Sequence, residues 1–183
     1  SSLFPAGSVT VSPETGDSGV ERTLTMDPAA NQNGTALVTV SVSDGSVTVN
    51  QQFTATVTAV NDVPVISSTA ITSSTEDEAY SYTLTASDVD VDALTYSAPT
   101  SPAWLSFDTD THVLSGTPFN DNVGDHSVVL RVNDGSVGVD QSFTITVANT
   151  NDTPALSGIT DPSAVLEDGD NISVVFTPTD EDV

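Results

Sequence analysis

The chain has 183 residues, of which 26 are acidic and only two, Arg22 and Arg131, are basic, so its formal charge at pH 7 is -24. Nucleic acids and anionic membrane surfaces are therefore excluded as partners, because binding them depends on clustered Lys and Arg. The sequence has no cysteine, which excludes a disulfide framework and a thiolate zinc site and leaves oxygen ligands with a hard cation, calcium first.

Strand patterns fill the chain from beginning to end, and the abundance of Ser, Thr, Val and Asp argues against helices. In chain order, apolar residues alternate in 36–42 and 47–57, in 80–86, in 128–132 and 137–147, and again at Ile172, Val174 and Phe176. The intervening positions are mostly Ser, Thr, Asn and Gln, as in antiparallel sheets with one side in water. About seven short strands in each stretch of about 90 residues predict an all-β chain of β-sandwiches.

An internal repeat divides the sequence. "AVNDVP" at 59–64 recurs as "NTNDTP" at 149–154, and "VSDGSV" at 42–47 recurs as "VNDGSV" at 132–137, each 90 residues later. A second alignment, of 75–90 with 166–182, places Asp88 on Asp180 and Asp90 on Asp182, 92 residues apart. The repeat predicts three parts: the C-terminal two thirds of one unit (1–62), a complete unit (63–152) and the N-terminal third of another (153–183).

The phase of the repeat at the two ends of the chain leaves two interpretations. In one, the segment is a window from a long tandem array and is internal to a larger protein. In the other, residues 154–183 complete residues 1–62 of a neighbouring chain by donating a strand. The linkers "VNDVP" and "TNDTP" contain no Gly/Ser spacer and end in proline, so we expect consecutive sandwiches to stack end to end.

Acidic residues gather at the predicted junctions. Asp88, Asp90 and Asp92 occupy alternate positions; in an extended segment they would share one face about 7 Å apart, and their repulsion favours a bound cation. The end loops of a sandwich lie together, so Asp134 and the linker residues Asn61 and Asp62 can join them. The second junction repeats the set with Asn151, Asp152, Asp180 and Asp182, and with Glu76 or Asp77 from the base of the preceding unit. These oxygens are the ligands that calcium prefers.

Several motifs carry a family resemblance. The sequences "TEDEAY", "DVD", N-D-x-P and "NDG" resemble the calcium motifs of cadherin repeats. The stretch "SPAWLSFDTDTHVLSGTPFNDNVGDHSVVLRVNDGS" resembles dystroglycan-type cadherin-like domains and the immunoglobulin-like repeats of bacterial surface proteins. The resemblance implies tandem Greek-key β-sandwiches and carries Glu76, Asp88, Asp90 and Asp134 over as calcium ligands. The cadherin linker is one residue longer and opens with aspartate where this chain has Ala59 and Asn149, which implies fewer or weaker ions.

The function that the resemblance implies is a calcium-stiffened stalk or adhesive repeat of a secreted, cell-surface bacterial adhesin. Its partners would be neighbouring repeats, similar domains or polysaccharide, with no membrane insertion. One alternative is a carbohydrate- or protein-binding module of a secreted enzyme, and another is a strand-donating fibre subunit. His112 and His126 lack the spacing of a catalytic metal site, so we expect no enzyme activity and place both at the surface. We expect Trp104 to plug the core and Arg131 to form a local salt bridge.

Overall fold

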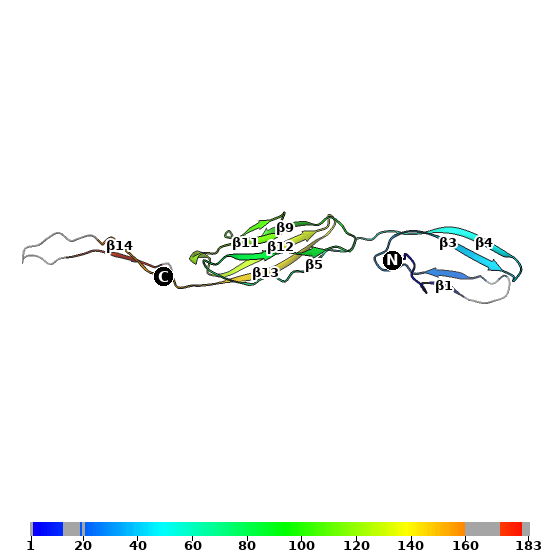
Figure 1. Ribbon diagram of the computed structural model, residues 1–183, viewed down its shortest axis with the longest axis horizontal. Helices are drawn as coiled ribbons and strands as arrows, with labels where there is room; N and C mark the ends of the chain where they lie inside the picture. Colours follow the sequence, from blue (N-terminus) through cyan, green and yellow to red (C-terminus); the bar gives the residue numbers. More distant parts are fainter. Residues whose placement is uncertain (1, 13–18, 20, 160–172, 181–183) are drawn as a thin grey trace, which may run out of the picture. The chain divides into compact units, whose positions relative to one another are not determined.

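The computed structural model describes residues 2–12, 19, 21–159 and 173–180, whose regular secondary structure is almost entirely β-strand. They divide into two units, the first made of 1–62 with 89–91 and the second of 63–88 with 92–183 (Figure 1). The first unit contains two antiparallel hairpins: β1 (Val9–Ser12) with β2 (Thr23–Met26), and β3 (Gly34–Ser43) with β4 (Thr48–Val57).

The remaining elements belong to the second unit. They are β5 (Val65–Ile66), β6 (Ser73–Thr75), β7 (Tyr80–Thr83), β8 (Ala86–Ser87), β9 (Thr95–Thr100), β10 (Ser106–Asp108), β11 (Val113–Gly116), η1 (Asn120–Asn122), β12 (Gly124–Asn133), β13 (Gly138–Ala148), β14 (Ala155–Ser157) and β15 (Thr177–Thr179).

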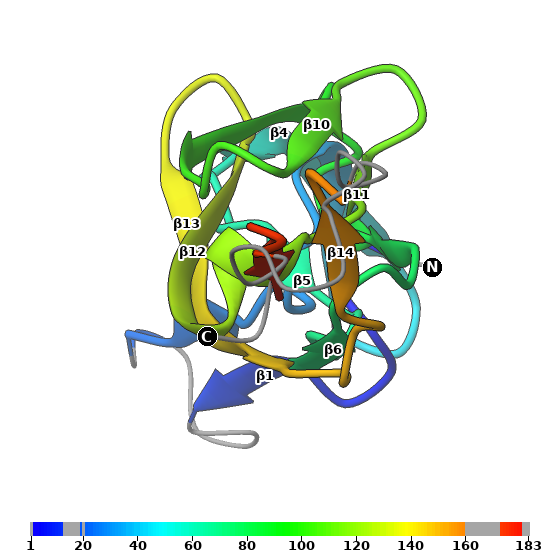
Figure 2. The ribbon, with the colours of Figure 1, turned by 90° about the vertical axis from the view of Figure 1, so that its left-hand side faces the viewer.

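Residues 63–152 fold as a β-sandwich. One sheet has the order β6-β13-β12-β9, with β6 parallel to β13, and the other has the order β10-β11-β7. The end-on view shows β12 and β13 along one side of this unit and β11 along the other (Figure 2). Within the same stretch β5 pairs with β8 in a short separate ladder, and after it in the sequence β14 pairs with β15.

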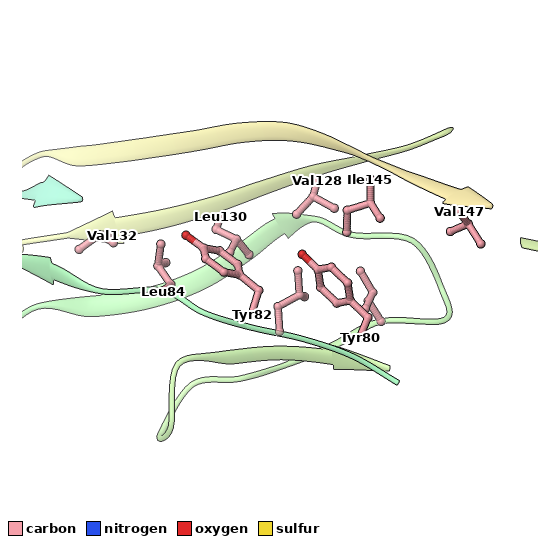
Figure 3. Close-up of a cluster of buried hydrophobic side chains, with 10 residues drawn as sticks. Tyr80, Tyr82, Leu84, Val128, Leu130, Val132, Ile145 and Val147 are labelled. Atoms are coloured by element: carbon pink, nitrogen blue, oxygen red, sulfur yellow. The ribbon is translucent and has the colours of Figure 1, made fainter. Parts of the chain in front are cut away.

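The core lies between these two sheets. Tyr80, Tyr82 and Leu84 alternate with exposed residues and point toward the buried side chains of β12 and β13 (Figure 3). This confirms the faces predicted for 80–86 and 128–132. Burying each such side chain contributes about 1.5 to 3 kcal/mol. The hydroxyl of Tyr82 donates to Oε1 of Gln141 at 2.6 Å, so the polar end of the ring is satisfied.

The same strand register recurs at the spacing of the repeat. All ten residue pairs of the β3–β4 hairpin, from Gly34–Val57 to Ser43–Thr48, reappear 90 residues later in β12–β13. The pairs Val65–Ser87 and Ile66–Ala86 reappear as Ala155–Thr179 and Leu156–Pro178, at offsets of 90 and 92. The strand pairs therefore recur at both offsets, 90 and 92, that the sequence alignment contains.

Two expectations about strands need correction. Residues 63–152 contain nine strand segments rather than about seven, because two strands are each split between partners. β5 pairs with β8 while β6 pairs with β13, and β7 pairs with β11 while β8 pairs with β5. The strand predicted at Ile172–Phe176 is also misplaced: residues 173–176 have no ladder partner, β15 begins at Thr177, and Ile172 lies outside the described residues. The division into three repeats and their end-to-end stacking stay predictions.

Candidate metal sites

The loop after β8 brings three carboxylates together. Oxygens of Asp88, Asp90 and Asp92 all lie within 4.8 Å of one another. The segment is a bend rather than an extended strand, and Val91 adopts a left-handed φ of 64°. This backbone is strained for a β-branched residue. The carboxylates thus approach through folding of the loop and lie closer than the roughly 7 Å of an extended segment.

Strand pairing positions this loop at one end of the sandwich. Val65 pairs with Ser87, which places Asp88 beside the linker that precedes β5. Thr95 pairs with Asn133, which brings the segment after Asp92 to the turn that contains Asp134. Asp134 is buried, and its Oδ1 accepts the backbone N–H groups of Ser136 and Val137 at 2.7 and 2.6 Å. Among the described residues, the group within 4.8 Å does not include Asp134.

The same turn occurs in the first unit. Oδ1 of Asp44 accepts the backbone N–H groups of Ser46 and Val47 at 2.9 and 2.8 Å. These two bonds, Val47 first, lower the pKa of Asp44 below 3.8 because they stabilise the charged carboxylate. In both "DG" turns, one carboxylate oxygen of the aspartate is therefore already bonded to backbone N–H groups of its own hairpin. The sequence alone did not reveal this.

The first linker contributes backbone and side-chain polar groups within the first unit. The backbone N–H of Asp62 donates to Oδ2 of Asp90 at 2.7 Å, and the amide of Asn61 donates to the carbonyl of Asp62 at 2.8 Å. A hollow of about 210 Å³ is lined by Asp62 and Asp90 and by the amide-rich run 31–33. We did not predict this run as part of a site, because its sequence, "NQN", indicated only a turn.

Glu76 lies at the other end of the second unit. Its backbone N–H donates to the carbonyl of Ala148 at 3.0 Å, and its Oε1 accepts the backbone N–H of Thr150. The side chain is 1% exposed, and its Oε2 is buried without a hydrogen-bond partner. Leaving a buried carboxylate oxygen unsatisfied is costly, and a cation is one group that would satisfy it.

The other residues predicted for this end are placed as follows. Asp77 is exposed, with φ 61°, and donates its N–H to the carbonyl of Pro118. The amide of Asn151 donates to the carbonyl of Asp152 at 2.8 Å, as Asn61 does to Asp62. Asp152 and Asp180 line one hollow of about 350 Å³. Asp182 lies outside the described residues.

Residues considered for other roles lie apart from these carboxylates. Arg131 donates from Nε and one terminal nitrogen to Asp140 at 2.6 and 2.7 Å, which confirms the local salt bridge. Trp104 packs against the core with its ring edge-on to Tyr80, as expected for a core plug.

The surface placement of the two histidines is wrong, since both are half-buried in ring contacts. His112 stacks on Tyr96 with ring centroids 3.6 Å apart, and His126 packs edge-on to Trp104.

Comparison with known proteins identifies the second unit. Residues 63–148 match the family described as "Putative Ig domain". Cadherin domains 1–4 of the extracellular part of protocadherin gamma B7 align with a TM-score of 0.54 at 20% identity, over 96% of this chain and 50% of that one. Cadherin domains EC1-2 of human protocadherin-24 align with a TM-score of 0.49 at 20% identity, over 78% of this chain and 77% of that one. The second unit is thus a β-sandwich whose fold is similar to immunoglobulin-like and cadherin domains.

A further likeness is partial. An endo-fucoidan hydrolase of glycoside hydrolase family 107 aligns with a TM-score of 0.43 at 28% identity over 78% of this chain. The chain spans 24% of that hydrolase's length. No curated protein matches the chain. Among the described residues, no helix has the length and apolar character needed to cross a membrane.

Proposed function

We propose that this chain is a calcium-binding segment of an extracellular stalk or adhesive repeat on a bacterial cell surface. The observation that carries the proposal is the loop in which oxygens of Asp88, Asp90 and Asp92 converge within 4.8 Å. Two unit charges 4 Å apart repel by about 1 kcal/mol in water and by about 4 kcal/mol near a protein surface. Of the two cations of the chain, Arg131 is bound to Asp140, so a metal ion is the natural counter-charge.

The buried oxygen of Glu76 supports a second site. A half-satisfied carboxylate in the interior is destabilising unless another group completes its coordination. Calcium takes six to eight oxygen ligands from carboxylates, amides and backbone carbonyls. Glu76 and Asp77, with Asn151, Asp152, Asp180 and Asp182, can supply such a set. The first site would use Asp88, Asp90 and Asp92 with Asn61, Asp62 and Asp134.

In the proposed mechanism, calcium replaces the repulsion between carboxylates around a linker with shared coordination, which makes the linker rigid. Without the ion, the carboxylates around each linker repel one another and neighbouring repeats move apart. With the ion, the same charges become ligands of one centre and fix the linker. Sites of the extracellular class bind calcium with dissociation constants of about 10⁻⁴ to 10⁻³ M. In this function the domain is non-catalytic, and its partners are neighbouring repeats, similar domains or a polysaccharide.

Small-angle scattering of the whole chain, in chelator and in millimolar calcium, tests the proposal. We expect the maximum dimension to increase and its distribution to narrow when calcium is added. Asp90→Asn removes one charge of the cluster and should weaken calcium binding at least several-fold in calorimetry. Asp121→Asn, on an exposed residue of η1, is the matched control and should bind as the wild type does. Identical scattering curves with and without calcium would overturn the stiffening mechanism, and absence of binding heat would overturn the site.

A further inference from the structure

Asn33 is the only asparagine of the sequence that a glycine follows. In an Asn-Gly pair the backbone nitrogen of the glycine can attack Cγ of the asparagine, because glycine has no Cβ to hinder the approach. The attack closes an imide ring and expels ammonia. Water then opens the ring, so that the carboxamide becomes a carboxylate. The sequence therefore raises the question of whether the fold permits this reaction at Asn33.

The structure leaves the side chain of Asn33 accessible to water. Asn33 is exposed and lies directly before β3, whose first residue is Gly34. Among the described residues, its carboxamide forms no hydrogen bond, whereas that of Asn61 donates to the carbonyl of Asp62. Gly34 and Val57 are the outermost pair of the β3–β4 ladder, and the ends of an element open more readily than its middle.

The exposure of this position recurs in the second unit. Val123 lies 90 residues after Asn33, directly before β12, and is 41% exposed. Residues 31–35 and 121–125 alternate between exposed and half-buried in the same order. Accessibility is therefore a property of this position of the repeat in both units.

The two Asp-Gly pairs of the described residues could close the same ring, but their reacting groups are held. In the first pair, the N–H of Gly45 donates to Oγ of Ser43 at 3.2 Å, while Oδ1 of Asp44 accepts two backbone N–H groups. The second pair, 134–135, is bonded in the same way, with its glycine N–H donating to Oδ1 of Asn133 at 2.7 Å. The nucleophile and the carboxylate are thus occupied in both pairs.

A carboxylate at position 33 would enter acidic surroundings. Asn33 lines the hollow of about 210 Å³ together with Asp62 and Asp90, and all the residues that line this hollow belong to the first unit. Another negative charge there adds repulsion when no cation is present. It also adds an oxygen of the kind that calcium prefers.

We propose that Asn33 deamidates spontaneously and that the carboxylate formed joins Asp62 and Asp90 in holding a cation. The nitrogen of Gly34 bonds to Cγ of Asn33 and loses its proton, the Cγ–Nδ2 bond breaks, and Nδ2 leaves with that proton as ammonia. One water adds across either C–N bond of the imide, restores an N–H and gives aspartate or isoaspartate. The role of the carboxylate rests on the proposed calcium function, whereas the modification does not.

Timed incubation of the whole chain at mildly alkaline pH, followed by peptide mass spectrometry, tests the modification. We expect position 33 to exchange NH₂ for OH at least several-fold faster than the other described asparagines. Asn33→Gln should stay unmodified, because its longer side chain would need a larger ring. Conversion of Asn33 at the rate of the other asparagines would overturn the proposal.

Asp44→Asn is the matched control for the effect of the fold. It creates a second Asn-Gly pair in the turn where the N–H of Gly45 is bonded to Ser43. In the folded chain, position 44 should be converted several-fold more slowly than position 33, and in concentrated urea the two rates should be similar. Equal rates in the folded chain would show that the structure does not select Asn33 and would overturn the proposal.

Calorimetry with calcium tests the role of the new carboxylate. Asn33→Asp carries the charge of the product and should bind calcium several-fold more tightly than Asn33→Gln, because the number of ligand charges tunes affinity. Equal affinities would overturn this role even where the mass change occurs. Absence of calcium binding in both variants and in the wild type would overturn the proposed function as well, and the timed mass change would still decide the modification.

Discussion

The side-chain carboxylate of Glu76 accepts a hydrogen bond from the backbone N–H of Thr150, a residue 74 positions later in the chain. The bond ties the end of β6 to the segment that follows β13. It also fixes one oxygen and leaves the other, Oε2, buried without a hydrogen-bond partner. That second oxygen is the atom that Glu76 would offer to the cation of the proposed second site.

Glu76→Gln should reverse its effect on stability when calcium is added. In chelator, we expect the neutral amide to leave the midpoint of thermal unfolding unchanged or to raise it, because no charge is buried. In calcium, the variant should lack about 1 to 3 kcal/mol of the stabilisation shown by the wild type. Circular dichroism melts in both buffers measure this. Glu78→Gln, on an exposed neighbour, should respond to calcium as the wild type does; a loss of equal size there would contradict the assignment.

Val132 and Val42 occupy the same position of the repeat but should contribute differently to the free energy of unfolding. Val132 is 0% exposed and Val42 is 70% exposed, although both lie in the same register of their hairpins. We expect Val132→Ala to lower the free energy of unfolding by about 2 kcal/mol, through lost burial and a residual cavity. Val42→Ala should change it by less than about 0.5 kcal/mol in dilute protein. Urea unfolding of both variants tests this, and equal losses would show that Val42 is packed as tightly as Val132.

These contrasts also show what the sequence could predict. The faces of 80–86 and 128–132 were predictable because alternating apolar residues can be buried only on one side of a strand. The strand at 172–176 was predicted from the same alternation, but residues 173–176 form no ladder among the described residues, because alternation alone does not specify a pairing partner. The convergence of Asp88, Asp90 and Asp92 depends on the left-handed backbone conformation of Val91. Such a conformation is expected at Gly or Asn, so a valine at this position does not predict it. The burial of Glu76 follows from tertiary packing, and local sequence does not encode it.

Acid should weaken the interaction between Arg131 and Asp140. The guanidinium of Arg131, through its hydrogen bonds and then its charge, lowers the pKa of Asp140 below 3.8. The stability that this pair contributes is present above pH 3.8 and is lost as the pH falls through the lowered folded value. An NMR titration of the Asp140 carboxyl should show the low pKa, and Arg131→Gln should raise it toward 3.8. A titration unaffected by the substitution would mean that the pair is not formed in solution.

Base should destabilise the sandwich through Tyr80. Burial, with a smaller contribution from the charge of Tyr82, raises the pKa of Tyr80 from 10.0 to about 12. The stability linked to the neutral phenol is present below pH 10 and is lost as the pH rises from 10 toward about 12. Tyr80→Phe should remove this alkaline loss. It should also cost about 1 kcal/mol at neutral pH, through the bond to the carbonyl of Ile71.

Absorbance of tyrosinate and urea unfolding, both measured across this pH range, provide the test for Tyr80. If the wild type and Tyr80→Phe lose stability in parallel above pH 10, another group is responsible.

The position of Arg131, paired with Asp140 within β12, has a consequence for resistance to proteases. Proteases of the trypsin type cut after Lys or Arg, and this chain offers only two such bonds, after Arg22 and after Arg131. The second lies within β12, between the flanking strands β9 and β13, where the backbone cannot enter a protease cleft without unfolding. Digestion of the folded chain would thus begin after Arg22, which precedes β2 and belongs to no strand.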